Sequence, residues 1–269
     1  ALLTGQIDMN RYVQFSQKKI FDGNSKFKTS VIPTGNWRGM VMNTERAPFD
    51  NPKVRKAVRL AVDRQELVDT VMGGEAVVSC DTPVAPTDQY RHNMGCKQNI
   101  AEAKKLLKEA GYPNGIEMVI HVSTKEPTWP TIAEVIQQQV AKAGIKVDIK
   151  MTPSKSYWKE TWMKKDVAMT RWNERSADSV LHEVYHSSAK WNESYYKSSD
   201  FDKNLADARG ELNFKKRKAL YEKAQHTLWE QSGTMIPYHV SKLVVTNSRV
   251  KNLDEVEVFS IQWHKVKVD

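Results

Sequence analysis

Two short patterns overlap in the stretch WNERSADSVLHEVYH, which covers residues 172–186. Its last five residues, HEVYH, follow the H-E-x-x-H spacing, in which two histidines on one helix face bind zinc and the glutamate activates a water molecule. Its first four residues place Arg175 three positions after Trp172, with Asn173 between them. Arginine presents a planar fork of N–H donors that suits a carboxylate or a phosphate. The stretch therefore predicts either a zinc helix or a site for an acidic group.

The zinc interpretation lacks a third protein ligand. The extended form of the motif needs Gly and His where this chain has Ala189 and Asn192. On a helical wheel the apolar side chains share one arc, and the candidate ligands fall on the polar side. The apolar arc holds Val180, Leu181, Val184 and Tyr185, and the polar side holds His182, Glu183 and His186. We expect a solvated helix face here and keep a zinc-dependent hydrolase as an alternative.

The elements that must position Trp172 can be predicted from local patterns. Residues 116–122 and 145–151 alternate apolar and polar side chains as strands do, and residues 131–144 between them have a helical pattern. Strand, helix, strand predicts a parallel βαβ unit with a right-handed crossover. Residues 166–172 predict another short strand. Because ligands in open α/β sheets bind outside the carboxyl ends of strands, we expect the site to lie where this strand ends.

Other helices are predicted from their end signals. Asn51 and Asp63 can each cap a helix within residues 51–74, and Asn99 can cap a further one that ends at Gly111. Elements without such signals are predicted as helices over 154–165 and 213–232 and as strands near 235–246.

Composition limits the classes of function. The chain has 269 residues, enough for a substantial core, and a formal net charge of +9. Its lysines alternate with acidic residues, and its longest basic run, KKRK at 215–218, lies inside a helical pattern. We expect a solvated face and no nucleic-acid partner, and keep a basic nucleic-acid-binding module as the second alternative. No apolar run approaches the ~18–20 residues of a membrane span.

The chemistry of an enzyme has little support in the sequence. There is no G-x-S-x-G, P-loop or G-x-G-x-x-G pattern, and neither cysteine has a histidine partner in its sequence context. Cys80 and Cys96 flank a loop rich in Pro, Thr, Asp and Asn, which is compatible with one disulfide or with two free thiols. Export from the cytoplasm would favour the disulfide. We expect no catalytic residue, no metal and no cofactor.

Several long segments resemble one known family. The segment MNTERAPFDNPKVRKAVRLAVDRQELVDTVMGGEA, residues 42–76, resembles the signature region of the family 5 solute-binding proteins of ABC transporters, the dipeptide-, oligopeptide- and nickel-binding group. The resemblance continues, in the family's order, over residues 82–90, 101–115, 135–149, 190–209 and 220–239.

This resemblance implies a fold and a division of the chain. The expected fold is α/β, a lobe of a type II (class C) periplasmic binding protein with βαβ units and a mixed, mainly parallel sheet flanked by helices. Family members have two lobes that close on the solute about a hinge, and this chain resembles a C-terminal portion. Residues 1–44 are expected to be a remnant of lobe I with the hinge strand, 45–240 to be lobe II, and 241–269 to be the hinge return and the lobe I tail.

The resemblance also implies site residues. Trp172 matches a tryptophan of the family's peptide binders, but Arg175 stands where they carry an aspartate that pairs with the peptide's amino terminus. The change of sign favours an acidic solute such as an opine or a glutathione-like compound. The other expected ligand-binding residues are Asn173, Trp191, Asn192 and Trp37. The alternatives are a surface Arg175 paired with Glu174 or Asp178, tryptophans that belong to the core, and asparagines that serve turns and loops.

The function that follows from the resemblance is solute binding without catalysis. We expect an extracytoplasmic component of an ABC importer that captures a small carboxylate-bearing solute by hinge closure and delivers it to a permease in the inner membrane. The expected location is the periplasm, or the extracellular face with a lipid anchor in a single-membrane bacterium. The expected assembly is a monomer.

Overall fold

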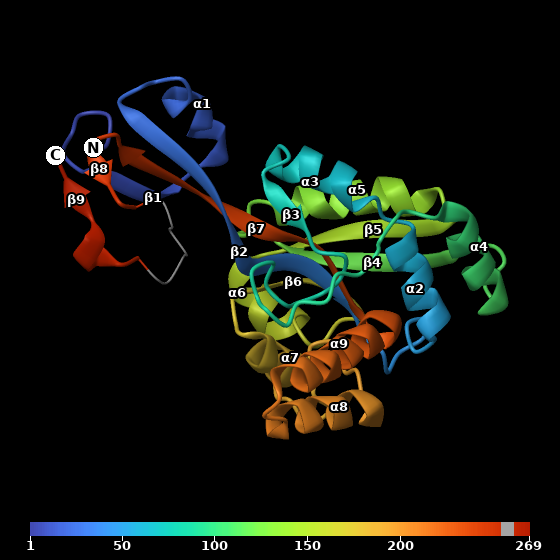
Figure 1. Cartoon of the computed structure of the whole chain (residues 1–269). Helices are drawn as coiled ribbons and strands as arrows, with labels where there is room; N and C mark the ends of the chain where they lie inside the picture. The colour runs from blue at the N-terminus through green and yellow to red at the C-terminus, as the bar shows by residue number, and fades with distance from the viewer. Residues whose placement is uncertain (254–260) are drawn as a thin grey trace.

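Two long strands, β2 and β7, lie side by side in the computed structural model and extend from the end that holds both termini into the helix-covered body (Figure 1). The structure describes residues 1–253 and 261–269. Within them, seven strands form this sheet in the order β1-β7-β2-β6-β4-β5, with β3 added beside β7. The strands are β1 (Met9–Val13), β2 (Phe27–Met42), β3 (Ala76–Val78), β4 (Ile116–Ser123), β5 (Ile145–Thr152), β6 (Val167–Trp172) and β7 (Thr234–Asn247).

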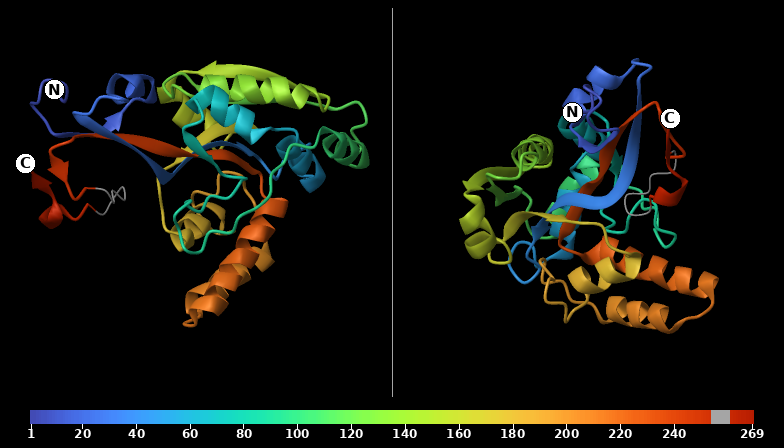
Figure 2. Two further views of the ribbon diagram at one scale, coloured as in Figure 1. Left: turned by 45° about the horizontal axis from the view of Figure 1, so that its top comes forward. Right: turned by 90° about the vertical axis from the view of Figure 1, so that its left-hand side faces the viewer.

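Helices cover both faces of the sheet. They are α1 (Lys18–Phe21), α2 (Pro52–Leu60), α3 (Arg64–Met72), α4 (Ile100–Glu109), α5 (Trp129–Ala141), α6 (Ser154–Ser156), α7 (Ala177–Tyr185), α8 (Ser199–Gly210) and α9 (Phe214–Gln231), with single turns η1 (Phe15–Gln17), η2 (Tyr157–Thr161) and η3 (Trp263–Lys265). Figures 1 and 2 show α3 and α5 on one face and α7, α8 and α9 together on the other. Each layer has its own apolar core. Across the described residues no helix is both long and apolar enough to cross a membrane.

The sheet is mixed, as expected, but its longest ladders are antiparallel. Among the described strands, parallel pairing joins β4 to β5 and, at one position, to β6. β2 pairs antiparallel with both β6 and β7. The expected predominance of parallel pairing is not found. The two longest strands, β2 and β7, run in opposite directions, so the ladder between them is antiparallel.

The predicted βαβ unit is confirmed. β4 and β5 pair in register from Ile116 opposite Ile145 to Ser123 opposite Thr152, with α5 as the crossover. α5 begins at Trp129, two residues before the predicted start, because Pro130 fits the first turn of a helix.

The predicted helix starts are also confirmed. Asn51 Oδ1 accepts the backbone N–H of Lys53 at 2.9 Å, and Asp63 Oδ1 accepts that of Gln65 at 3.0 Å. These bonds satisfy donors that the first turn of a helix leaves without a partner. α3 ends at Met72, and the next residue, Gly73, has a φ of 60°, in the left-handed region that glycine adopts at least cost.

The helix predicted over residues 154–165 is wrong in its length. α6 has a single turn, and η2, a π-helical turn, follows it directly. The Tyr157 side chain reaches between two strands, where its hydroxyl donates hydrogen bonds to the carbonyl oxygens of His121 on β4 and Met169 on β6. The ring of Trp129 lies 5.4 Å from that of Tyr157. The segment therefore follows the packing of its aromatic side chains rather than the period of a regular helix.

A smaller unit projects from the helix-covered body (Figure 1). It contains β1, α1 and the short strands β8 (Val250–Lys251) and β9 (Lys267–Val268), together with both termini. β2 and β7 connect it to the body. The division into 1–44, 45–240 and 241–269 stays a prediction, and residues 254–260 of its last segment lie outside the described residues.

Candidate functional site

The expected site residues begin where β6 ends. β6 ends at Trp172, as predicted, and α7 starts at Ala177 after a four-residue loop. Ser176 caps α7 by accepting the N–H of Ser179 at 3.3 Å, and Asp88 accepts the N–H of Ala177 at 2.9 Å. The loop at residues 173–176 is therefore held at its helical end by two side-chain acceptors.

This loop borders an open hollow. A volume of about 250 Å³ is lined by Ala85, Thr87, Asp88, Glu174, Arg175 and Ser176. A neighbouring hollow of about 520 Å³ shares Thr87, Asp88 and Ser176 with it. The loop after β6, the start of α7 and the segment 85–90 thus line two adjoining hollows.

Arg175 lies on the wall of this hollow and is paired with an acid that we did not expect. Its Nε atom is 3.2 Å from Glu183 Oε2, and both side chains remain about two-fifths exposed, at 39% and 42%. Asp178 instead pairs with Arg209 at 2.7 Å. The Glu174 carboxylate accepts the backbone N–H of Gly35 at 2.9 Å. Neither acid expected to pair with Arg175 does so, because each already has another partner.

Trp172 contacts Arg175 on one side and the buried Glu193 on the other. Its half-buried indole lies 6.0 Å from the Arg175 guanidinium carbon, measured to the ring centroid. Its Nε1 donates to Glu193 Oε1 at 3.1 Å. Trp37 stands opposite Trp172 in the β2–β6 ladder and is fully buried. Trp37 therefore forms part of the core behind the site, whereas Asn173 is exposed in the loop.

Glu193 is a residue of this region that sequence reasoning missed. It is 4% exposed, and its Oε1 accepts hydrogen bonds from Trp162 Nε1 at 2.7 Å and Thr170 Oγ1 at 2.8 Å, as well as from Trp172. Thr170 and Trp172 point to the same face of β6 because side chains alternate along a strand. Burial raises the pKa of Glu193 to about 7, and the three hydrogen bonds offset part of this effect. The sequence signal that could have pointed to Glu193 is its position in the run KWNESYY, residues 190–196, in which Trp191 and Asn192 were expected to bind the solute.

The two other expected residues of that run have different surroundings. Trp191 is 39% exposed and stacks on Trp162 with ring centroids 5.5 Å apart. Asn192 is buried and holds its own loop, since its Oδ1 accepts the N–H of Tyr196 at 3.1 Å and its Nδ2 donates to the carbonyl oxygen of the same residue at 2.5 Å. The structure thus brings Trp191 toward Trp172 through Trp162, while Asn192 is turned into the loop.

The zinc-like segment has other partners. The expected apolar arc of α7 is buried, and the rings of His182 and His186 lie 4.8 Å apart on its other side. Glu183 accepts a hydrogen bond from Ser179 Oγ at 2.6 Å, and this bond, followed by Arg175, lowers its pKa. In the part of the chain that the structure describes, no group of three or more potential ligands could hold a metal ion.

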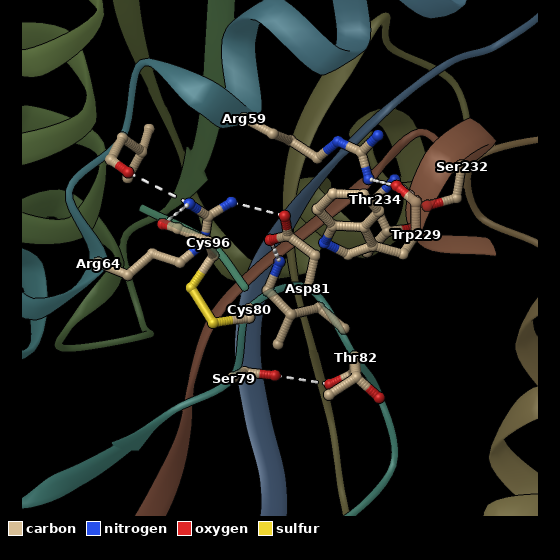
Figure 3. Close-up of polar contacts among 12 residues, drawn as sticks. Arg59, Arg64, Ser79, Cys80, Asp81, Thr82, Cys96, Trp229, Ser232 and Thr234 are labelled. Atoms are coloured by element: carbon tan, nitrogen blue, oxygen red, sulfur yellow. Dashed lines mark hydrogen bonds and ion pairs between the residues drawn. A yellow bond between two sulfur atoms is a disulfide. The ribbon is translucent and has the colours of Figure 1, made fainter. Parts of the chain in front are cut away.

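A buried network holds residues 79–82 (Figure 3), which come just before the residues 85–88 that line the hollow. Cys80 and Cys96 form a disulfide with their Cα atoms 5.1 Å apart. Beside it, Arg64 Nη2 and Asp81 Oδ2 form a buried ion pair at 2.5 Å. A disulfide that closes a loop of this size stabilises a protein by about 3 kcal/mol. The network therefore fixes the chain just before residues 85–90.

The sequence comparisons identify the family. Residues 1–192 match the family described as bacterial extracellular solute-binding proteins, family 5 Middle. The chain belongs to the family 5 solute-binding proteins. This confirms the resemblance seen in residues 42–76 and the segments after it.

Several known proteins are similar to this chain in sequence or in fold. The glutathione-binding protein GsiB of Salmonella choleraesuis (strain SC-B67) is 30% identical over 261 residues, which cover 92% of this chain and 51% of GsiB. The periplasmic binding protein DppA from Helicobacter pylori, solved with the peptide STSA, is 26% identical with a TM-score of 0.79, over 100% of this chain and 54% of DppA. HbpA2 from Haemophilus parasuis has the same fold, with a TM-score of 0.87 at 24% identity over 100% of this chain and 55% of HbpA2. The chain spans about half the length of the curated relatives it matches.

Proposed function

We propose that this chain forms one wall of the solute site in the binding component of an ABC importer, and that Arg175 binds an acidic group of the solute. One observation carries the proposal: an exposed guanidinium lies above the Trp172 indole and lines an open hollow at the carboxyl end of β6. Strand ends of this kind are where open α/β sheets bind ligands. Membership of a solute-binding family supports the same interpretation.

The contacts of Arg175 leave room for a solute carboxylate. Within the described chain its hydrogen bonds use Nε, to Glu183 at 3.2 Å, and Nη1, to the Glu174 carbonyl oxygen at 3.3 Å, and leave Nη2 unused. Exposed ion pairs contribute only ~0–1 kcal/mol, so exchanging Glu183 for a solute costs little. A carboxylate that met the guanidinium side-on would gain two parallel hydrogen bonds.

The proposed solute is a small compound that carries a carboxylate, such as an opine, a peptide-like compound or an amino-acid conjugate. GsiB is a glutathione-binding protein and the DppA structure holds a peptide. Both ligand classes carry carboxylates, which suits an arginine. Peptide binders of the family carry an aspartate at the position of Arg175. An aspartate would instead favour an ammonium group.

Capture is proposed to occur by closure of two lobes about β2 and β7, the strands that connect the body to the smaller unit. Charge-assisted hydrogen bonds would orient the solute and no bond would be made or broken. The protein would then deliver the solute to an ABC permease in the inner membrane. We propose a periplasmic monomer, or a lipid-anchored extracellular one in a single-membrane bacterium.

Replacing Arg175 with alanine is expected to weaken binding of a carboxylate-bearing solute by about 10- to 100-fold, the size of one hydrogen-bonded charge pair. The solute is first found by thermal-shift screening of opines, glutathione derivatives and short peptides, with the protein at its full natural length. Calorimetry then compares the variants. Arg175→Lys should be intermediate, because a lysine keeps the charge but not the fork.

The matched control is Arg46→Ala. It also removes one positive charge from an exposed ion pair, here with Asp166, the residue before the start of β6. It should leave affinity unchanged. Equal affinity of the Arg175→Ala variant and the wild type would contradict the role of Arg175. Failure of every solute in the screen to bind the wild type would contradict the proposed function.

A further inference from the structure

Glu193 connects Trp162 with Thr170 and Trp172 of β6 through one carboxylate oxygen. Its Oε1 accepts hydrogen bonds from Trp162 at 2.7 Å, Thr170 at 2.8 Å and Trp172 at 3.1 Å. The ring of Trp172 lies 6.0 Å from the Arg175 guanidinium carbon. A buried acid thus holds the N–H edge of the indole next to the arginine that we propose to bind the solute.

We propose that Glu193 is a positioning residue of the solute site, which holds the indole of Trp172 beneath Arg175 while it is ionised and loosens it when protonated. The proposal rests on the proposed function, in which Arg175 binds the acidic group of the solute. Hydrogen bonds to an ionised acceptor are roughly twice as strong as those to a neutral one. A proton on Glu193 therefore weakens three bonds at once, and solute affinity depends on a group that the solute does not touch.

The surroundings of Glu193 make this change of charge accessible. The residue is 4% exposed, and its Oε2 has no hydrogen-bond partner among the residues that the structure describes. Burial raises the pKa of the carboxyl group to about 7, against the partial opposition of its three donors. Burial and these three hydrogen bonds are the causes of its shifted pKa. The two indoles and the hydroxyl therefore stabilise the ionised carboxylate. When the carboxylate is protonated, the hydrogen bonds from these three groups weaken.

The other titratable groups around Glu193 behave differently. Tyr157 and Tyr185 are affected by its charge, and burial raises both of their pKa values, so both stay neutral in the range of interest. Burial lowers the pKa of His121 on β4 and of His182 on α7. The charged and phenolic groups of the adjoining segments include Arg171 with Glu126, Arg175 with Glu183, Lys159 and Lys164 with Glu160, Lys165, Asp166, Glu174, Lys190, Tyr195 and Tyr196.

The first test needs no solute. Indole N–H resonances are followed by NMR in ¹⁵N-labelled protein from pH 5 to pH 9, and those of Trp162 and Trp172 are assigned with Phe substitutions. Both should shift with one midpoint near 7, the pKa of Glu193. Glu193→Gln, which keeps an oxygen acceptor, should abolish the shift. Thr170→Val should move the midpoint to higher pH, because the ionised form loses a donor.

Resonances that do not shift, or that shift equally in the Glu193→Gln variant, would overturn the proposal. Any midpoint that survives the substitution belongs to another group, such as one of the histidines.

The second test measures the link to the solute, with glutathione, the ligand in the name of GsiB, as the probe. Wild-type affinity should be about fivefold higher at pH 8 than at pH 6, because stronger charge-assisted bonds then hold the indole. In the Glu193→Gln variant the affinity should change less than about twofold, because no charge is lost there. The same pH dependence in both proteins would overturn the link.

Failure of the proposed function has a different signature. Neither protein would then bind any solute of the screen at either pH, while the indole resonances would still decide whether Glu193 positions Trp162 and Trp172.

Discussion

Replacing Asp81 with alanine should lower the free energy of unfolding by about 3–5 kcal/mol, because a buried arginine would lose its ion-pair partner. Arg64 and Asp81 are 3% and 2% exposed at their side chains, with Nη2 and Oδ2 2.5 Å apart. Asp81 Oδ1 also accepts the backbone N–H of Ile236 at 2.9 Å. A second guanidinium, that of Arg59, lies beside the pair and has a pKa that burial lowers (Figure 3). One carboxylate thus balances two buried cations.

Urea denaturation of two comparison proteins separates this effect from a general loss of charge. The double variant Arg64→Met, Asp81→Leu should lose less stability than Asp81→Ala, because it does not leave the Arg64 guanidinium buried without its partner. Asp166→Ala breaks an exposed pair with Arg46 and should cost less than about 1 kcal/mol. If Asp81→Ala cost no more than Asp166→Ala, the buried pair would not be the anchor of the segment that lines the hollow.

The stability of the Glu193→Gln variant relative to wild type should rise by about 3 kcal/mol between pH 4.5 and pH 7.5. The folded protein raises the pKa of Glu193 from 4.5 to about 7. Such a group stabilises the fold fully below the unfolded value, and this contribution is lost as pH rises through the folded value. Glutamine has no proton to lose, so the variant escapes this penalty. Urea denaturation of both proteins at several pH values measures the difference.

Glu183→Gln is the matched control for this pH series. The pKa of Glu183 is lowered, first by its hydrogen bond from Ser179 and then by Arg175. Stability from such a group is present at high pH and is lost as pH falls, so the slope for this variant should have the opposite sign. A flat difference between wild type and Glu193→Gln across the series would show that the buried carboxyl does not titrate as its surroundings require.

Local signals in the sequence were enough to predict much of the body. The alternating residues of 116–122 and 145–151 define a βαβ unit by themselves, and Asn51, Asp63 and Asn99 start helices through bonds to their own next turns. Each of these features depends on residues close together in the chain. Their physical cause can therefore be read without the fold.

Features that depend on distant partners could not be predicted in this way. β2 and β7 pair from Phe27 opposite Asn247 to Val41 opposite Thr234, across nearly the whole chain, and nothing local specifies that ladder. The segment 154–165 has a helical pattern but is redirected because Tyr157 fits between β4 and β6. Tertiary contacts outweighed local preference in both cases.

The residues of the candidate site also divide into those that local signals predict and those that depend on distant partners. Trp172 and Arg175 were predicted from a strand end and a family resemblance, and both lie where β6 ends. Glu183 was not expected as the partner of Arg175, since eight residues separate them. Glu193 was missed because glutamate usually lies at the surface, and only the fold buries it against two indoles.

The most direct test of the central claim is a double-mutant cycle between Arg175 and the solute's own carboxylate. Calorimetry measures wild type and Arg175→Ala, each with a solute found in the screen and with the analogue in which that carboxylate is an amide. If Arg175 binds this group, the amide should weaken binding to wild type by about 10- to 100-fold and change the affinity of Arg175→Ala little. Equal losses in both proteins would contradict the claim, because the carboxylate would then be bound elsewhere.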